Sequence, residues 1–435
     1  MESYKVRPLK TENIKVTVPG SKSITNRALL LAALTDGESI LKGALFSDDS
    51  RHFLQSLKDL GFQVEDNEET KVVKVVGCGG RIPKSTGEIY VGSAGTAARF
   101  LTAMLGLSSG EYIINASEQM KKRPMKPLFD ALRSMGTQIE FLEAEDALPV
   151  TIKGCFYGAE NTLLEDRRKI QLDISSSTQF LSAFLMIGCM CQGGLDIEVT
   201  SEKKGGSYVD ITRGMVAEFG GDIEFDGTTY RVANKPYRCM EYQIEPDVSA
   251  ACYFYGMAAI CGVKAMVRNV HFNSTQGDIR FVKLMEQMGC KVEDTEEGIV
   301  VIGPDKSKGE MLKGISYLDM NNFSDQALTL ATVAIYADSP TTIGHIEHIR
   351  GQECDRLYAI AANLQAMGIQ CDEKEDSITI YPGTPKSAKI ETFEDHRVAM
   401  SFALPGLAGA DVTILNPICC RKTFEEYFQV LDSLT

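Results

Sequence analysis

An internal repeat is the feature of this chain that most constrains its fold. Six times along the sequence an apolar, helix-like run leads through a Gly or a turn into a short strand, and these runs begin near positions 28, 97, 179, 250, 326 and 398. The spacing gives a period of about 70 to 80 residues, which indicates a chain assembled from repeated structural units. We therefore expect six successive copies of one α/β unit.

Each unit continues with a second, amphipathic helix. Five of these helices end in the same way, with a Gly that leads into a strand: "LKDLGFQVE", "LRSMGTQIE", "VAEFGGDIE", "MEQMGCKVE" and "LQAMGIQCD". A further strand closes each of these five units, as in "KVVKVVG" and "GIVVIG". The unit is αβαββ or a circular shift of it, and the expected fold class is α/β (α+β) with six βαβαββ-type repeats.

The sixth unit has no strand after its second helix, since the chain ends in "VLDSLT". A spare strand pattern, "YKVRPLKTENIKVTVPG", stands instead near the N-terminus and could supply the missing strand. This predicts two lobes of three repeats each, residues 1–20 with 245–435 and residues 21–244. Because the chain would cross twice between the lobes, we expect a ligand cleft between them.

Composition excludes several classes of protein. The formal net charge of -14 disfavours extended nucleic-acid binding, and 44% hydrophobic residues are typical of a globular chain. No stretch approaches the ~18 apolar residues of a membrane span, and "MESYKVRPLK" lacks the apolar core of a signal peptide. We therefore expect a cytoplasmic protein without a membrane partner. The 12 cysteines form no CxxC pair, and we expect them to be reduced.

Basic residues recur where the helices begin. The segment "GSKSITNR" places Lys22 and Arg27 at an expected helix start, where free backbone N–H groups and the helix dipole already favour anions. Equivalent segments before the other helices are rich in capping residues, and several carry a cation. If these helix starts converge, they form a site for a multiply anionic small molecule, with the cations Lys22, Arg27, Arg123, Arg356, Arg397 and Lys422.

Simpler interpretations of the same motifs stay open. "GSKSITNR" could be a solvated capping segment, and "EDHR" and "QECDR" could be surface salt-bridge patches. "VGSAGT" lacks a full dinucleotide-binding GxGxxG. "HIEHIR" has metal-like His spacing but no evident third ligand, so we expect no metal.

Eight motifs, in order along nearly the whole chain, resemble those of the 5-enolpyruvylshikimate-3-phosphate synthase family. They are "PGSKSITNRALLLAAL", "GSAGTAAR", "KKRP", "YVDIT", "QGDIRF", "ECDRL", "EDHRVAM" and "KTFEEYF". The resemblance implies a two-lobed inside-out α/β barrel. It also implies transfer of the enolpyruvyl group from phosphoenolpyruvate to the 5-hydroxyl of shikimate 3-phosphate, with release of phosphate. It further implies a monomer that is a target of glyphosate and needs no cofactor.

The resemblance also implies roles for individual residues. Asp325 would take the proton of the 5-hydroxyl, and Glu353 would protonate the methylene carbon and later remove that proton, with Lys22 and His396 assisting. The shikimate 3-phosphate site would comprise Lys22, Ser23, Arg27, Ser177, Thr178, Gln179, Tyr208 and Asp325. The phosphoenolpyruvate site would comprise Lys22, Gly95, Thr96, Arg123, Gln179, Arg356, Arg397 and Lys422.

The chain departs from the family pattern at a few positions. Gln352 stands where the family usually has Lys, Gly205 and Gly206 replace a Ser-Lys pair, Ser93 replaces Asn and Phe100 replaces Pro. These departures bear on anion binding more than on the reaction class. Because a lysine adds a charge-assisted hydrogen bond, we expect Gln352→Lys to improve the use of phosphoenolpyruvate.

Three alternatives remain from the sequence. The sister family, UDP-N-acetylglucosamine enolpyruvyl transferase, shares the fold but carries a Cys in the loop that here reads "ASEQMKKRPMKP". A nicotinamide oxidoreductase would need a fuller fingerprint than this chain offers. A non-enzymatic repeat scaffold of the clamp type would not explain the charged residues at matching helix starts.

Overall fold

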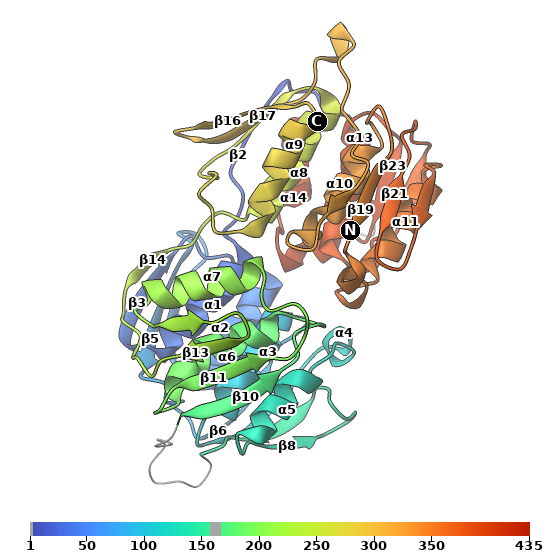
Figure 1. The fold of residues 1–435 in the computed structure, drawn as a ribbon. Coiled ribbons are helices and arrows are strands. Elements are labelled where there is room, and N and C mark those ends of the chain that lie inside the picture. Colours follow the sequence, from blue (N-terminus) through green and yellow to red (C-terminus); the bar gives the residue numbers. More distant parts are fainter. Residues whose placement is uncertain (1–2, 157–166) are drawn as a thin grey trace. The chain divides into compact units, whose positions relative to one another are not determined.

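The chain folds into two compact units. The computed structural model describes residues 3–156 and 167–435. Unit 1 comprises Met1–Pro19 and Glu245–Thr435, and unit 2 comprises Gly20–Ile244 (Figure 1). Each unit has its own hydrophobic core. Within the described residues, no helix has both the length and the apolar character needed to cross a membrane.

Unit 2 contains the first three repeats and one additional strand. Its elements are α1 (Lys22–Leu34), β3 (Asp36–Lys42), α2 (Asp48–Asp59), β4 (Gln63–Asn67), β5 (Val72–Cys78), β6 (Thr86–Tyr90), α3 (Gly95–Gly106), β7 (Glu111–Asn115), α4 (Glu118–Lys121), α5 (Lys126–Ser134), β8 (Gln138–Phe141), β9 (Val150–Lys153), β10 (Arg168–Leu172), α6 (Gln179–Ile187), η1 (Gly188–Met190), β11 (Leu195–Val199), α7 (Ser207–Glu218), β12 (Ile223–Phe225), β13 (Thr229–Val232) and β14 (Glu241–Gln243).

Unit 1 contains the N-terminal strands and the last three repeats. Its elements are β1 (Ser3–Lys5), β2 (Asn13–Val16), α8 (Val248–Cys261), β15 (Lys264–Val267), η2 (Gly277–Ile279), α9 (Arg280–Gln287), β16 (Lys291–Thr295), β17 (Gly298–Ile302), η3 (Lys306–Lys308), β18 (Leu318–Asp319), η4 (Ser324–Gln326), α10 (Ala327–Ala334), β19 (Thr341–Gly344), η5 (Glu347–Gly351), α11 (Arg356–Ala366), β20 (Cys371–Glu373), β21 (Ile378–Ile380), β22 (Ala388–Ile390), α12 (His396–Phe402), α13 (Leu404–Leu407), β23 (Val412–Leu415), η6 (Pro417–Lys422) and α14 (Tyr427–Leu434).

The sheets repeat one topology, which confirms the predicted fold class. Five described sheets have four strands, and in each an outer strand pairs in parallel with its neighbour while the other two pairings are antiparallel. Their orders are β14-β3-β5-β4, β6-β7-β9-β8, β10-β11-β13-β12, β2-β15-β17-β16 and β18-β19-β21-β20. The sixth sheet is β22-β23-β1.

The N-terminal segment completes two sheets, where the sequence predicted one spare strand. β1 pairs antiparallel with β23, with Tyr4 opposite Ile414, and so supplies the strand that the sixth repeat lacks. β2 pairs in parallel with β15 and becomes the outer strand of the fourth sheet. The difference arises because each repeat opens with a strand before its first helix. β14, which follows the third repeat, fills the same place for the first sheet.

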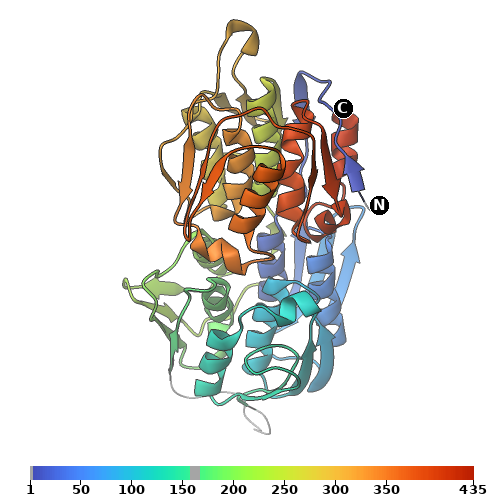
Figure 2. The same cartoon turned by 90° about the vertical axis from the view of Figure 1, so that its right-hand side faces the viewer.

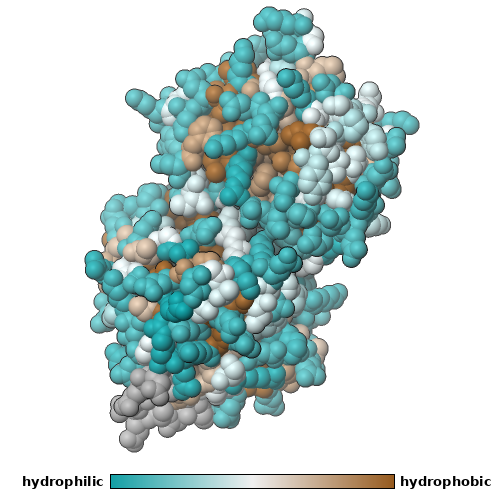
Figure 3. Space-filling model, viewed as in Figure 1, coloured by the Kyte–Doolittle hydropathy of each residue, from teal (hydrophilic) through white to brown (hydrophobic). Residues whose placement is uncertain are grey.

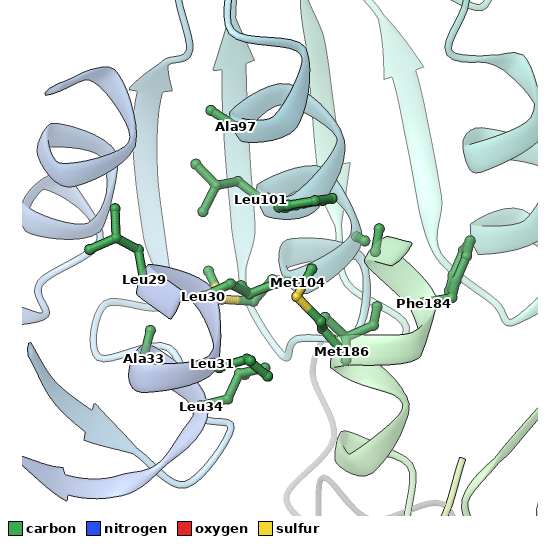
Figure 4. Close-up of a cluster of buried hydrophobic side chains, with 14 of the residues drawn as sticks. Leu29, Leu30, Leu31, Ala33, Leu34, Ala97, Leu101, Met104, Phe184 and Met186 are labelled. Atoms are coloured by element: carbon green, nitrogen blue, oxygen red, sulfur yellow. The ribbon is translucent and has the colours of Figure 1, made fainter. Parts of the chain in front are cut away.

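The first helix of each repeat lies in the core. In α1 every residue from Ile24 to Leu34 is buried, whereas α2 buries one stripe that includes Phe53, Leu54 and Leu57. Leucines of α1 gather with residues of α3 and α6 (Figure 4). In each unit the helices pack against that unit's own sheets (Figure 2). A helix that is apolar on all sides can present polar groups only at its ends, so the polar chemistry is placed at the helix starts.

Hydrophilic residues cover most of the face drawn in Figure 3, and hydrophobic residues show between them in small groups. Scattered apolar residues of this kind are normal on a folded surface. The features that carry chemistry are therefore the charged groups at the helix starts.

Candidate active site in two half-sites

The predicted residues fall into one set in each unit. Unit 2 holds Lys22, Ser23, Arg27, Gly95, Thr96, Arg123, Ser177, Thr178, Gln179 and Tyr208, and unit 1 holds Asp325, Glu353, Arg356, His396, Arg397 and Lys422. Most of them lie at helix starts or in the segments directly before them, whereas Arg27 lies in the second turn of α1 and Lys422 is the last residue of η6. The structure thus presents two half-sites, one in each unit.

Arg356 is the centre of the half-site in unit 1. It is the first residue of α11 and is 1% exposed. Its Nε donates to Asp395 Oδ2 at 2.7 Å, and its Nη2 donates to Glu353 Oε2 at 2.9 Å and to Asp395 Oδ1 at 3.3 Å. Its Nη1 donates to Asp325 Oδ1 at 2.8 Å and to the side-chain oxygen of Gln352. All five N–H donors of the guanidinium are therefore in use.

The charge of Arg356 is strongly stabilised. Burial alone would lower the pKa of its guanidinium, but the carboxylates of Asp395, Glu353 and Asp325 outweigh burial and raise that pKa. Asp395 also caps α12 by accepting from the backbone N–H of Arg397 at 2.8 Å. Arg356 thus stays a cation, and an anionic ligand can bind it only by displacing one of its acceptors.

The two predicted proton-transfer groups are each held between two cations. Asp325 contacts Arg356 through Oδ1 and Arg397 Nη2 through Oδ2 at 3.0 Å. Glu353 contacts Arg356 through Oε2 and Lys422 Nζ through Oε1 at 3.2 Å. The Asp325 and Glu353 side chains remain 13% and 10% exposed. Both carboxylates can therefore meet a ligand while their positions are fixed by hydrogen bonds.

His396 is a buried member of this half-site. It is the first residue of α12 and is 1% exposed, and its Nδ1 lies 3.7 Å from Asp395 Oδ1. Its ring therefore lies beside the carboxylate of Asp395, which contacts Arg356.

Lys22 begins the half-site in unit 2. It is the first residue of α1, and its Nζ lies 3.2 Å from Oδ2 of Asp49, a buried carboxylate at the start of α2. The Lys22 side chain is 17% exposed. Asp49 lies in the segment "SDDSRHF" and is not among the residues predicted for the site. A buried counter-charge keeps the ammonium in place at the surface of the unit.

Gly95 and Thr96 open α3 beside Arg123. The Nδ2 of Asn26 donates to Thr96 Oγ1 at 2.6 Å. A Cβ added at Gly95 would lie 2.8 Å from Arg123 Nη1 and 2.9 Å from Nη2, so the glycine makes room for the guanidinium. Arg123 Nη1 lies 3.5 Å from the carbonyl oxygen of Ser93. A side chain at Gly95 would therefore crowd Arg123, directly at the start of the helix.

Arg27 is buried rather than presented at the surface. Its Nε donates to Thr212 Oγ1 at 2.7 Å and its Nη1 to the Ser23 carbonyl at 2.9 Å, while Nη2 donates to Ser182 Oγ and the Tyr208 carbonyl, both at 3.2 Å. Its Cζ lies 5.3 Å from the ring centroid of Phe100 and 5.9 Å from that of Tyr208. Burial lowers the pKa of Arg27 to about 10.

These contacts occupy four of the five N–H donors of Arg27, all with neutral acceptors. One N–H of Nη1 is left for a ligand. The residue therefore ties α1 to α6 and α7, and it can offer a ligand at most one hydrogen bond in this state.

The start of α6 is held by a second buried arginine. Ser177 Oγ accepts from the backbone N–H of Gln179 at 3.2 Å, and Gln179 Oε1 accepts from Arg99 Nη1 at 2.5 Å. Arg99 also lies 5.0 Å from the Phe180 ring centroid. Sequence reasoning missed the role of Arg99, although it lies within the motif "GSAGTAAR", because its partner is 80 residues away.

The motif with metal-like spacing has ordinary partners. His345 Nδ1 contacts Asp319 Oδ2 at 2.7 Å, and His348 Nε2 contacts Ser324 Oγ at 2.8 Å. Among the residues that the structure describes, no group of three or more His, Cys, Asp or Glu side chains is arranged to hold a metal. All twelve cysteines are free thiols.

A family model described as EPSP synthase (3-phosphoshikimate 1-carboxyvinyltransferase) matches residues 6–431. The chain belongs to the EPSP synthase family. The resemblance seen in the sequence motifs is thereby confirmed, and the chain is an enolpyruvyl transferase by family.

Curated relatives agree over almost the full length. The 3-phosphoshikimate 1-carboxyvinyltransferase of Trichormus variabilis is 40% identical over 415 residues, which cover 95% of this chain and 94% of the relative. That of Serratia proteamaculans is 39% identical over 438 residues, which cover 99% and 98%. These matches do not favour the oxidoreductase or scaffold alternatives.

Solved structures have the same fold. The EPSP synthase from Acinetobacter baumannii matches with a TM-score of 0.80 at 27% identity, covering 100% of this chain and 98% of that one. The enolpyruvyl transferase NikO from Streptomyces tendae matches with a TM-score of 0.75 at 14% identity, covering 99% and 97%, and supports the fold alone.

Proposed function

We propose that this chain transfers the enolpyruvyl group of phosphoenolpyruvate to the 5-hydroxyl oxygen of shikimate 3-phosphate and releases phosphate. The observation that carries the proposal is the half-site of unit 1, in a chain that belongs to the EPSP synthase family. Asp325 and Glu353 each lie between two cations there, with Arg356 common to both. Two fixed carboxylates beside a cluster of cations suit a reaction that moves two protons around a multiply anionic substrate.

Phosphoenolpyruvate is assigned to the cations. Arg356 and Arg397 offer forked donors that match planar carboxylate and tetrahedral phosphate groups, and Lys422 adds a point charge. Gly95, Thr96 and Arg123, with Lys22 and Gln179, are assigned to the same substrate from unit 2. The free backbone N–H groups at the start of α3 support this assignment, because a helix start favours an anion.

Shikimate 3-phosphate is assigned mainly to unit 2, with its reacting hydroxyl near Asp325. Lys22, Ser23, Ser177, Thr178, Gln179 and Tyr208 surround the starts of α1, α6 and α7. Arg27 acts chiefly by holding the Ser23 and Tyr208 carbonyls, and it adds one hydrogen bond through Nη1.

The proton transfers are assigned as follows. Asp325 takes the proton of the 5-hydroxyl while the hydroxyl oxygen bonds to C2 of phosphoenolpyruvate. Glu353, which must be in its protonated form for this step, donates its proton to the methylene carbon, and a tetrahedral adduct results. Glu353 then takes a proton from the new methyl group as the bond from C2 to the phosphate oxygen breaks and phosphate leaves. Lys22 and His396 assist by stabilising negative charge.

Both sets of residues are needed for one reaction, so we propose that they act together in a cleft between the lobes. We also propose that the enzyme acts as a monomer in the cytoplasm. Light scattering coupled to size-exclusion chromatography measures the molar mass and so tests whether the enzyme is a monomer. Cell fractionation tests whether it is in the cytoplasm.

Product analysis tests the proposed function. Incubation with both substrates should yield shikimate 3-phosphate carrying one added enolpyruvyl group, detected by mass spectrometry. The same incubation with UDP-N-acetylglucosamine in place of shikimate 3-phosphate should give no product, because the loop at residues 116–127 has no cysteine. Product from the nucleotide sugar alone would overturn the assignment in favour of the sister family.

A further inference from the structure

A buried carboxylate outside the predicted site lies directly behind the half-site of unit 1. Asp278 is in η2, just before α9, and is 6% exposed. Its Oδ2 accepts one hydrogen bond from Ser249 Oγ and a second one from Gln326 Nε2 at 3.0 Å. None of the roles assigned above uses this group.

Both hydrogen bonds lead to residues of the half-site. Ser249 Oγ also accepts from Arg397 Nη2 at 3.4 Å. Gln326 follows Asp325 in the single turn η4, so a bond to its side chain holds that turn. One buried carboxylate therefore connects the guanidinium of Arg397 with the turn that carries Asp325.

The charged groups of this half-site, with Asp278, carry more negative than positive charge. Arg356, Arg397 and Lys422 supply three cations, against four carboxylates if Asp278 is ionised. The charges of Asp325 and Arg397 both act on Asp278. The backbone carbonyl of Asp278 accepts a hydrogen bond from the thiol of Cys252 on α8. The charges of Asp278 and Asp247 both act on that thiol. Burial, followed by the charge of Asp325, raises the pKa of Asp278 to about 6. The carboxylates of this count are Asp278, Asp325, Glu353 and Asp395.

An anion that binds at Arg397 adds further negative charge beside Asp278. Like charges disfavour one another in a buried site, and the carboxylate that most easily takes up a proton is the one without a direct ion pair to a cation. Asp325, Glu353 and Asp395 each contact Arg356 directly, whereas Asp278 contacts neutral side chains.

We propose that Asp278 takes up a proton when an anionic ligand binds to the cations of this half-site, and that it acts as a positioning residue for Arg397 through Ser249. That the natural ligand is phosphoenolpyruvate rests on the proposed function. The coupling of proton uptake by Asp278 to anion binding does not. Neutral Asp278 no longer competes with the ligand for the charge of Arg397, so ligand affinity and proton uptake rise together.

Sulfate is a suitable probe because its charge does not change over the range studied. Its dissociation constant is measured calorimetrically for the wild type between about pH 5 and about pH 8. The wild-type constant should rise with pH above about 6, by up to about tenfold for each pH unit, since one proton is bound with each anion. Asp278→Asn keeps an oxygen that can accept both hydrogen bonds but removes the titration. This variant should bind sulfate tightly and almost independently of pH.

Two further variants complete the test. Asp372→Asn removes an exposed carboxylate of the same unit, and it should keep the wild-type pH dependence. Ser249→Ala breaks the link to Arg397 and should weaken sulfate binding at every pH. Circular dichroism checks that each variant is folded.

An unchanged pH dependence in Asp278→Asn would overturn the coupling, and so would wild-type sulfate binding that does not vary with pH. Loss of sulfate binding in folded Asp278→Asn at every pH would also overturn it, because the residue would then serve the structure only. Turnover with both substrates is measured separately on the wild type. Its absence would refute the proposed function and leave the sulfate result to decide on Asp278.

Discussion

Gln352 offers a quantitative test of how the substrate reaches Arg356. The five N–H donors of Arg356 are taken by the carboxylates of Asp325, Glu353 and Asp395 and by the amide oxygen of Gln352, which is the one neutral acceptor. A substrate carboxylate should displace this neutral acceptor first. A hydrogen bond from a charged donor is worth about 1.5 to 3 kcal/mol, and breaking it opposes binding.

Gln352→Lys removes that acceptor and adds a cation. If only about 1.4 kcal/mol is realised, kcat/KM for phosphoenolpyruvate rises about tenfold. Repulsion from Arg350 is limited because its Nη1 and Nη2 pair with Asp355 and Glu373 at 2.9 and 2.8 Å. Gln352→Met removes the acceptor without adding charge and should give a smaller gain. Gln352→Glu adds a competing carboxylate and should give a loss.

Steady-state kinetics at saturating shikimate 3-phosphate measure this series. The KM for shikimate 3-phosphate serves as the control and should stay within about twofold, since the change acts on the other substrate. An unchanged or lower kcat/KM for phosphoenolpyruvate in Gln352→Lys would refute the reasoning. It would mean that the added cation is repelled by Arg356 and displaces Glu353.

Further predictions concern the same groups. Asp325→Asn and Glu353→Gln should each lose turnover by orders of magnitude while keeping shikimate 3-phosphate affinity in calorimetry, as expected of proton-transfer groups, and retained turnover would remove that residue from the mechanism. Gly95→Ala should push the Arg123 guanidinium away and so raise the KM for phosphoenolpyruvate. It should raise the inhibition constant of glyphosate by a larger factor than this KM, and equal factors for the two ligands would contradict the crowding account. Asp278→Asn should raise the free energy of unfolding above about pH 6, by up to about 3 kcal/mol, and should not raise it below about pH 4. The sign follows because a carboxyl whose pKa is raised on folding destabilises the folded state only where it is ionised, and denaturant titrations at the two pH values check it.

Periodicity made the repeats predictable. The first helix of a repeat is apolar on all sides, which predicts that it lies in the core, and the second is amphipathic, which predicts that it lies at the edge of the core. The N-terminal strand that completes the sixth sheet was predictable because a repeat with a missing part leaves an unpaired edge. That β2 forms a separate strand in the fourth sheet could not be read from the sequence, since it depends on which edge of which repeat is left open.

The helix starts gave the candidate residues, but their contacts required the structure. The partner of Arg27 Nε is Thr212, 185 residues away, and no local pattern reveals that this arginine is buried. The carboxylates Asp49 and Asp278 were missed for a different reason. Asp49 is buried beside a cation and Asp278 beside the neighbours of one, and the burial of a single residue at a helix start has no periodic signal in the sequence.

Phosphate release tests the central claim most directly. The wild-type chain is incubated with phosphoenolpyruvate and shikimate 3-phosphate together, and with each alone, and inorganic phosphate is measured over time. The account predicts phosphate release that requires both substrates and continues through many turnovers. Release from phosphoenolpyruvate alone, or none with the pair, would contradict the assignment of this chain as an enzyme that joins the two substrates.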